Sequence, residues 1–245
     1  MSKNTVMILG ARSDIAMAVA HRFANEGYDL QLAARNSENM HKDKLDIELR
    51  YQIKVTLHNF DALELKSHDE LLDSLPILPN IAVCAVGLLG NQKINERDIE
   101  TTTKIIRSNF EGPVSILSAL ANRFEQRGSG TLIGISSVAG ERGRAANYIY
   151  GSAKSGFTTF LSGLRNRMTS KGVHIITVLP GFVDTKMTNR LDLPSKLTAK
   201  PDDVAVAIIK ATKKRRDIIY IKSIWRQIMF VIKCIPEKIF KTLNL

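Results

Sequence analysis

The sequence contains few of the residues that build disulfide frameworks or metal sites. Its 245 residues include only two cysteines, Cys84 and Cys234. So few thiols favour a reducing compartment, and Cys84, which lies in an apolar run, is interpreted as a small buried side chain. The five histidines show no metal-ligand spacing along the chain, so we expect no metal centre.

A charged leader followed by a hydrophobic signal segment is also absent, because a strand-like run, Thr5–Leu9, begins almost at once. We therefore expect a cytoplasmic protein without a secretion signal. Hydrophobic residues make up 44% of the chain and charged residues 24%, which is typical of a globular protein. The length suits one large α/β domain or two small domains.

Positive charge is concentrated at the C-terminal end. From Lys210 onward there are ten basic and two acidic residues, a balance of +8 out of the net +11 of the whole chain. Residues 1–209 therefore carry only +3. The main body has no excess of charge for binding nucleic acid, and we expect no such partner.

Predicted strands and helices alternate along the chain. Strands are expected at 5–9, 28–33, 54–60, 81–86, 131–135, 173–179 and 218–221. Helices are expected at 15–25, 37–51, 67–74, 96–107, 111–126, 149–170 and 201–213. This order predicts a Rossmann-like α/β fold, a doubly wound parallel sheet with helices on both faces. We expect a single domain over 1–222 and an appended tail over 223–245.

Three polar residues stand at a spacing that suits acid–base chemistry. Tyr150 lies thirteen positions after Ser137, and Lys154 follows Tyr150 by four. If a helix begins near Tyr150, the lysine lies one turn on, on the same face. A cation there favours the ionised phenol and lowers its pKa, so Tyr150 could exchange a proton with a substrate oxygen held by Ser137. A solvated tyrosine–lysine pair is the alternative.

The first predicted strand is followed by a turn that could bind phosphate. Gly10 opens this turn, and a helix is expected from residue 15. Backbone N–H groups at a helix N-terminus bind anions, and ligands of doubly wound sheets lie beyond the carboxyl ends of the strands. The turn has a single glycine, so a plain turn is the alternative to a dinucleotide site. Asp14 is predicted to cap the helix.

With this turn included, the spacing of Ser137, Tyr150 and Lys154 resembles that of the short-chain dehydrogenase/reductase family, over about residues 5–222. The resemblance implies that these three residues are the catalytic serine, tyrosine and lysine. The family's glycine loop is written TGxxxGxG, whereas Asp14 and Ala16 replace its second and third glycines here. The resemblance therefore requires the side chain at position 14 to point away from the pyrophosphate, or the phosphates to shift.

Further landmarks of the family follow in order. Asp61 matches the acid that contacts adenine, and Asn109 matches the asparagine of the proton relay. The segment 85–87 matches the end of the NNAG element, although Cys84 replaces an asparagine, and the segment 180–185 matches PGxVxT. The resemblance implies cofactor contacts at Gly10, Arg12, Ser13, Asp14, Ile15, Arg35, Asp61, Ala85, Val86, Gly87, Tyr150, Lys154, Pro180, Gly181, Val183 and Thr185.

Charge at the end of the second predicted strand indicates which cofactor is preferred. NAD-binding proteins place an acid there for the ribose 2′-hydroxyl, whereas this chain has Ala33 and Ala34 followed by Arg35. A guanidinium suits a 2′-phosphate, and Arg12 could reach the same group. We predict NADP(H), with NAD(H) as the alternative cofactor and two solvated arginines as the simpler explanation.

The activity implied by the resemblance is hydride transfer between NADP(H) and a carbonyl or secondary alcohol. Tyr150 would be the general acid or base, and Ser137 would orient the substrate oxygen. Lys154 would lower the tyrosine pKa and hold the nicotinamide ribose, while Asn109 would position a water that returns the proton. Two alternatives stay open: a reductase of a polyprenyl-phosphate-linked keto sugar, and a non-catalytic sensor of NADPH.

The tail is a basic amphipathic segment. Apolar residues recur at helical spacing at Ile224, Trp225, Ile228, Met229, Ile232 and Ile235, and Pro236 ends this helix. Its longest unbroken apolar run, 228–232, is far too short to span a bilayer. The segment either lies on an anionic membrane surface, at the inner face of a membrane, or packs against the body or a sister subunit.

The substrate and the oligomer are expected from the resemblance alone. The segment 187–200 resembles a substrate lid, with an apolar wall from Met187, Leu191, Leu193 and Leu197. We expect a small-molecule or lipid-linked carbonyl substrate. Family members pair through the helices that carry Asn109 and Tyr150, which implies a homodimer or homotetramer.

Overall fold

A seven-stranded parallel sheet forms the centre of the computed structural model, which describes residues 4–189 and 191–243. The strand order is β3-β2-β1-β4-β5-β6-β9, and every neighbouring pair is parallel. The strands are β1 (Thr5–Leu9), β2 (Asp29–Ala34), β3 (Val55–Asn59), β4 (Ile81–Cys84), β5 (Gly130–Ile135), β6 (Val173–Pro180) and β9 (Ile218–Ile221). The predicted doubly wound α/β fold is confirmed.

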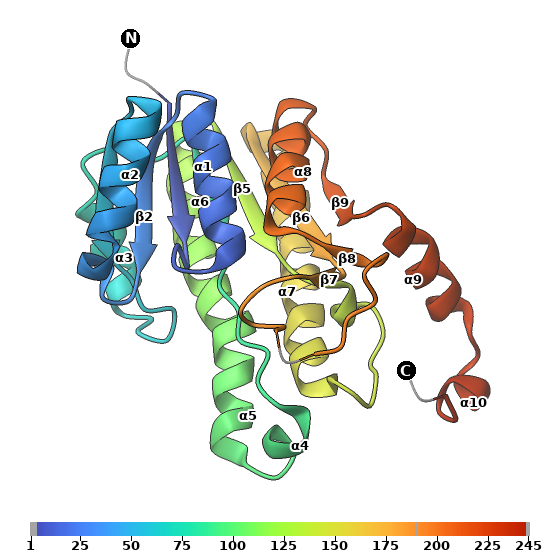
Figure 1. Ribbon diagram of the computed structural model, residues 1–245. Helices are drawn as coiled ribbons and strands as arrows, with labels where there is room; N and C mark the ends of the chain where they lie inside the picture. The colour runs from blue at the N-terminus through green and yellow to red at the C-terminus, as the bar shows by residue number, and fades with distance from the viewer. Residues whose placement is uncertain (1–3, 190, 244–245) are drawn as a thin grey trace.

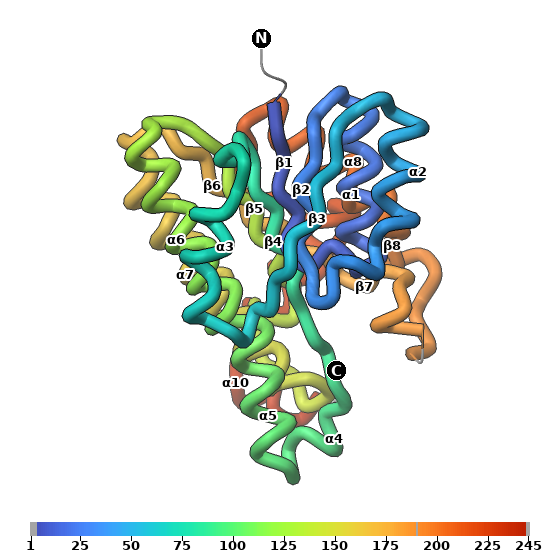
Figure 2. Tube along the Cα trace, turned by 90° about the vertical axis from the view of Figure 1, so that its left-hand side faces the viewer, coloured from blue at the N-terminus to red at the C-terminus, as the bar shows by residue number. Residues whose placement is uncertain are grey.

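Helices cover both faces of this sheet (Figure 1). One face carries α1 (Asp14–Asn25), α2 (His41–Tyr51) and α8 (Pro201–Lys213). The other carries α3 (Ser67–Asp73), α6 (Gly112–Arg127) and α7 (Tyr148–Met168). Figure 2 shows the two groups on opposite sides of the strands. Since both faces are covered, the central strands β1 and β4 are apolar at nearly every position rather than at alternate ones, whereas the edge strand β3 alternates.

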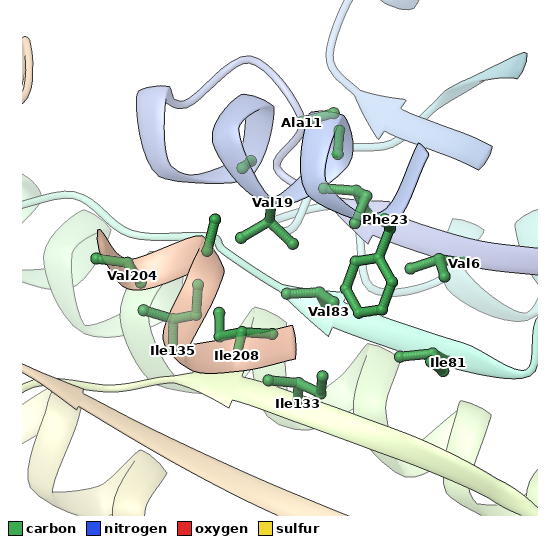
Figure 3. Packing of buried hydrophobic residues seen from close by; sticks show 14 of the residues in the cluster. Val6, Ala11, Val19, Phe23, Ile81, Val83, Ile133, Ile135, Val204 and Ile208 are labelled. Carbon is green, nitrogen blue, oxygen red and sulfur yellow. The ribbon is translucent and has the colours of Figure 1, made fainter. Parts of the chain in front are cut away.

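Alternation along β1 assigns its side chains to two separate cores. Val6 and Ile8 point to the core beneath α1 and α8, whereas Met7 and Leu9 point to the core beneath α6 and α7. All four side chains are fully buried. Figure 3 shows the first core, in which Val19 and Phe23 of α1 meet Val204 and Ile208 of α8 above the strands.

The helical region before β5 differs from its prediction. A break was expected between 107 and 111, but α5 (Ile99–Ile106) continues through a π-helical turn, Arg107–Glu111, into α6. Pro113 has no N–H to donate to the preceding turn, and the helix widens just before it. An ion pair between Arg107 and Glu111 spans the wide turn. Helix α4 (Gln92–Asn95) was not predicted.

Most other boundaries agree with the predictions to within a residue or two. Those of α8 and β9 agree fully. The helix expected over 37–51 is a 3₁₀ turn, Ser37–Met40, followed by α2, and a similar turn, Thr169–Lys171, follows α7. A small pair of strands, β7 (Phe182–Val183) and β8 (Thr198–Ala199), was not predicted because two residues are too few to show a period.

The tail forms α9 (Ile224–Cys234) and α10 (Glu237–Phe240), which lie beyond the β9 edge of the sheet (Figure 1). Trp225 and Met229 are buried against Val138 and Leu179, so the face predicted to be apolar packs largely on the body. Ile224 is an exception, because it is exposed. The domain boundary predicted at 222 stays a prediction. None of the helices in the described part of the chain is long and apolar enough to cross a membrane.

Candidate active site

Two adjoining cavities form one cleft at the carboxyl ends of the strands. The first runs from the start of α1 to Tyr150 and Lys154, and the second runs from the start of α1 to Arg35 and Asp61. They share Arg12, Ser13, Ala85, Val86, Gly87 and Lys186 in their walls. Each of the sixteen residues predicted to contact the cofactor lines one cavity or the other.

The glycine turn takes a conformation that a single glycine can provide. Gly10 has φ +80°, in the left-handed region that favours glycine, and an added Cβ would lie 3.1 Å from the carbonyl oxygen of Ala85. The N–H groups of Gly10 and Ala11 both donate to the carbonyl of Ala33. Ser13, rather than Asp14, caps α1, since its hydroxyl accepts from the N–H of Ala16.

Asp14, where the family has a glycine, turns away from the glycine turn. Its carboxylate accepts from the backbone N–H of Lys186 at 2.7 Å and lies 3.6 Å from the Lys186 ammonium. The prediction that Asp14 caps the helix is therefore wrong. The alternative requirement, a side chain directed away from the pyrophosphate, stays a prediction, and the carboxylate is bound by the segment after β7.

Two arginines stand in the second cavity without partners. Arg12 and Arg35 are exposed, and neither guanidinium makes a hydrogen bond or ion pair with any described residue. Asp61 lines the same cavity, and its carboxylate accepts from the N–H of Leu63 at 2.9 Å. This cavity therefore presents two free cations at the ends of β1 and β2.

Lys154 is buried deep beneath the first cavity. Its side chain is 2% exposed, and its ammonium donates to the carbonyl oxygens of Ile135 at 3.0 Å and Val86 at 3.3 Å. Tyr150 lies one turn earlier on α7, and the ammonium is 5.9 Å from the centre of its ring. The predicted helical relation between the two residues is confirmed.

Ser137 follows β5 and faces the same cavity. Its hydroxyl accepts from the N–H of Ala139 at 3.1 Å and makes a long contact of 3.5 Å to the carbonyl of Pro180. A donor at 3.5 Å is held weakly. The hydroxyl proton of Ser137 is therefore available to another acceptor in the cavity.

The pKa values of the pair differ from the prediction. Burial raises the pKa of Tyr150 to about 12, although the nearby Ser137 hydroxyl acts in the opposite direction. Burial also lowers the pKa of Lys154 to about 8. The prediction that Lys154 lowers the tyrosine pKa is wrong for this structure. The Lys154 ammonium donates its hydrogen bonds to two backbone carbonyls, and burial has the largest effect on the pKa of the Tyr150 phenol.

Asn109 lies outside the walls of both cavities. It is fully buried in the π-helical turn, where its amide nitrogen donates to the carbonyls of Leu88 and Ile105 and its oxygen accepts from the N–H of Leu88. These bonds fix the position of the segment that follows β4 and contains Gly87 and Leu88. The proton-relay role stays a prediction.

Several cavity residues were not singled out from the sequence. They include Leu88, Lys104, Ser108, Ser136, Lys186 and Thr188. Of these residues, only Lys186 lines both cavities. Its position directly after the 180–185 element is the one feature of the sequence that could have indicated it. Met187 belongs to the predicted lid and lines the first cavity, whereas Leu191 is exposed and Leu197 packs beside Trp225.

Comparison with known proteins agrees with this geometry. The sequence model of the short chain dehydrogenase family matches residues 4–195. An uncharacterized oxidoreductase of Mycobacterium tuberculosis is 34% identical, covering 96% of this chain and 95% of the relative. The NADP-dependent 3-hydroxy acid dehydrogenase of Schizosaccharomyces pombe is 27% identical, covering 88% and 89%. A short-chain dehydrogenase from Sphingobium yanoikuyae, solved in complex with NADPH, has a TM-score of 0.79 at 22% identity, covering 96% and 97%.

Replacement of Lys154 by Met should change how stability depends on pH. The folded pKa of about 8 lies below the ordinary value of 10.5, so between these values the unfolded chain binds more protons. This group therefore makes the wild type more stable as pH rises from about 8 to 10.5. The variant lacks that gain, on the order of 3 kcal/mol.

Urea unfolding at pH 7 to 10.5 measures this difference. Lys93→Met, a change at an exposed lysine of α4, is the control and should give a curve parallel to that of the wild type. If the free energy of unfolding depends on pH in the same way for Lys154→Met and the wild type, the interpretation of Lys154 as a buried, charged lysine is contradicted.

Proposed function

Because this chain belongs to the short-chain dehydrogenase family, we propose that it transfers hydride between NADP(H) and a carbonyl or secondary alcohol, with Tyr150 as the general acid or base. The family makes the chain an oxidoreductase. The observation that carries the proposal is the single cleft in which Ser137, Tyr150 and Lys154 adjoin the two free arginines.

The residues at the carboxyl ends of the strands fit a dinucleotide. The first turn of α1 offers backbone N–H groups to phosphate, and the Asp14 carboxylate on that turn accepts from the N–H of Lys186. Asp61 stands beyond β3 for the adenine end, and Val183 and Thr185 stand beyond β6 for the nicotinamide end. When bound there, NADPH supplies the hydride.

The protonation of Tyr150 favours a role as general acid. A phenol with a pKa of about 12 is protonated at neutral pH and can donate to a carbonyl oxygen that gains negative charge. The weakly held Ser137 hydroxyl would donate to the same oxygen. Lys154, with a pKa of about 8, would supply positive charge close to the phenol and hold the nicotinamide ribose. Reduction of a carbonyl is the direction that this arrangement supports.

Asn109 is assigned a positioning role next to the proposed relay. Two of its three hydrogen bonds hold Leu88, which follows Gly87 in the wall of both cavities. A water ordered near this turn would return the proton to Tyr150 through Lys154.

Tyr150→Phe tests the general acid. Because the variant loses only the hydroxyl, kcat/KM for NADPH-dependent ketone reduction should fall by about 10²–10⁴-fold, while the Kd for NADPH stays unchanged. Tyr148→Phe is the matched control, since Tyr148 lies on the same turn, is exposed, and bonds only to Glu96. Full activity in Tyr150→Phe would reject the assignment.

The preference for NADP(H) rests on Arg12 and Arg35. The two residues that end β2, Ala33 and Ala34, are buried and carry no acid for a ribose 2′-hydroxyl. The free guanidiniums in the second cavity suit a 2′-phosphate instead. The Schizosaccharomyces pombe relative and the Sphingobium structure, named for NADP and NADPH, support the same choice.

Arg35→Ala should reduce the preference for NADPH over NADH by about 10- to 100-fold, since it removes charged hydrogen bonds to one phosphate. The ratio of kcat/KM values for the two cofactors is the measurement. Arg50→Ala, on the exposed face of α2, should leave the ratio unchanged. An unchanged ratio in Arg35→Ala, or equal efficiency of the wild type with both cofactors, would contradict the proposal.

The outer side of the tail supports a finer proposal, that α9 and α10 lie on an anionic membrane. Phe230 and Val231 are 67% and 60% exposed, and Ile239 and Leu243 are exposed beyond them. Exposed cations of the tail accompany them at Arg226, Lys238 and Lys241. Apolar side chains among cations suit the interface of an anionic bilayer. A lipid-linked carbonyl, such as a polyprenyl-phosphate-linked keto sugar, would then be the substrate.

Sedimentation with vesicles tests this contact. The protein should sediment with phosphatidylglycerol vesicles at low salt and be released at high salt. The double variant Phe230→Ser, Val231→Ser should sediment less, whereas Leu45→Ser, Leu49→Ser, at two exposed leucines of α2, should behave as wild type. If the wild type stays in the supernatant at low salt, the membrane proposal fails. A homodimer or homotetramer through the helices with Asn109 and Tyr150 stays a prediction.

A further inference from the structure

Buried polar atoms without partners occur on the segments that adjoin the amino end of α7. Across residues 4–189 and 191–243, six buried side-chain nitrogen or oxygen atoms lack a hydrogen bond. Four of them lie on α4 or in the segment that links Ser137 to Tyr150: Gln92 Nε2, Glu141 Oε2, Arg144 Nε and Asn147 Oδ1. An unpaired buried polar group costs stability, so native proteins keep few of them. Gln92 contacts the residue before Tyr150 and Glu141 acts on Arg144, so a polar ligand at this end of α7 could pair with these atoms.

Backbone bonds hold these side chains around the amino end of α7. The side-chain oxygen of Gln92 accepts from the N–H of Ile149, the residue before Tyr150. Asn147, which precedes α7, donates its N–H to the carbonyl of Arg144 at 3.1 Å and accepts at its own carbonyl from Gly151 at 2.8 Å. Figures 1 and 2 both place α4 beside this end of α7.

Charge around the cluster leaves one cation unmatched. The Arg144 guanidinium makes no hydrogen bond or ion pair with any residue that the structure describes, and burial lowers its pKa. Glu141 is near enough to oppose that shift, but its other oxygen is bound by the ammonium of Lys233 and the hydroxyl of Tyr220. The charge of Glu141 is therefore already balanced by Lys233 of α9, and that of Arg144 is not.

We infer that Arg144, with Gln92 and Asn147, binds an oxyanion of the substrate, a carboxylate or a phosphate ester, and so determines specificity. The inference rests on the proposed function, because Tyr150 must meet the carbonyl of the same molecule. A guanidinium and the amide of Gln92 donate to such an anion, and an asparagine amide can present its nitrogen or its oxygen to it. The free oxygen of Glu141 can accept from a hydroxyl next to the anion.

Paired substrates with and without the charge test the inference by kinetics. The pairs are acetoacetate with methyl acetoacetate, and dihydroxyacetone phosphate with dihydroxyacetone, each reduced with NADPH. Arg144→Gln should raise KM for the preferred charged member by about 10- to 100-fold and leave its neutral partner within about twofold. Arg144→Lys should recover part of the loss. The two pairs distinguish a carboxylate from a phosphate ester.

Arg142→Gln is the matched control. Arg142 lies two positions away in the same segment, but its guanidinium is paired with Glu237 and covers the ring of Phe240. This variant should keep the wild-type ratio of charged to neutral substrates. The same melting temperature and Kd for NADPH in all variants would show that the segment stays folded.

A binding measurement without turnover separates this inference from the proposed function. Malonate and inorganic phosphate are titrated into protein saturated with NADP⁺, and Arg144→Gln should weaken the tighter anion by about tenfold or more. If ketones are reduced but neither KM nor anion binding depends on Arg144, the inference fails and the reductase stands. If anion binding depends on Arg144 but no ketone is reduced, the site stands and the reductase fails. A wild type that neither binds anions nor distinguishes charged substrates overturns the inference.

Discussion

A buried ammonium, that of Lys154, connects the parts of the site. It stands between the carboxyl ends of two central strands and donates to a carbonyl on each side, at Val86 and Ile135. No carboxylate balances it among the described residues, and burial lowers its pKa to about 8. Holding a charge there costs free energy that the packing of the sheet must offset. The cost is consistent with a functional residue, because a Leu or Met would pack there without it.

The tail packs against residues that belong to the site. Trp225 of α9 packs on Gly181, where an added Cβ would lie 2.0 Å from the indole, and its N–H donates to the carbonyl of Leu197 at 3.0 Å. Gly181 lines the catalytic cavity, and Leu197 lies in the segment that resembles a lid. A shift of α9 would therefore displace both. Any partner of the outer face of the tail, membrane or protein, acts on a helix that contacts the site through one side chain.

The sheet could be predicted because burial on both faces makes each strand a short apolar run, and the turns between them contain glycine or polar residues. The spacing of Ser137, Tyr150 and Lys154 indicated which side chains share a helix face. The spacing of residues along the sequence cannot show how deeply a side chain is buried, and burial determines the pKa of Tyr150. The π-helical turn before Pro113 and the unpaired atoms around Arg144 also depend on contacts between segments that no local pattern records.

Asp14 shows how a departure from a family pattern can be accommodated. A glycine at this position would present no side chain, whereas Asp14 binds the backbone N–H of Lys186 and lies beside its ammonium. Lys186 borders both cavities and directly precedes Met187. Asp14 therefore ties the start of α1 to the segment after β7, which lines the first cavity. Movement of that segment must break a bond to α1, so the two ends of the cleft are mechanically linked in this chain.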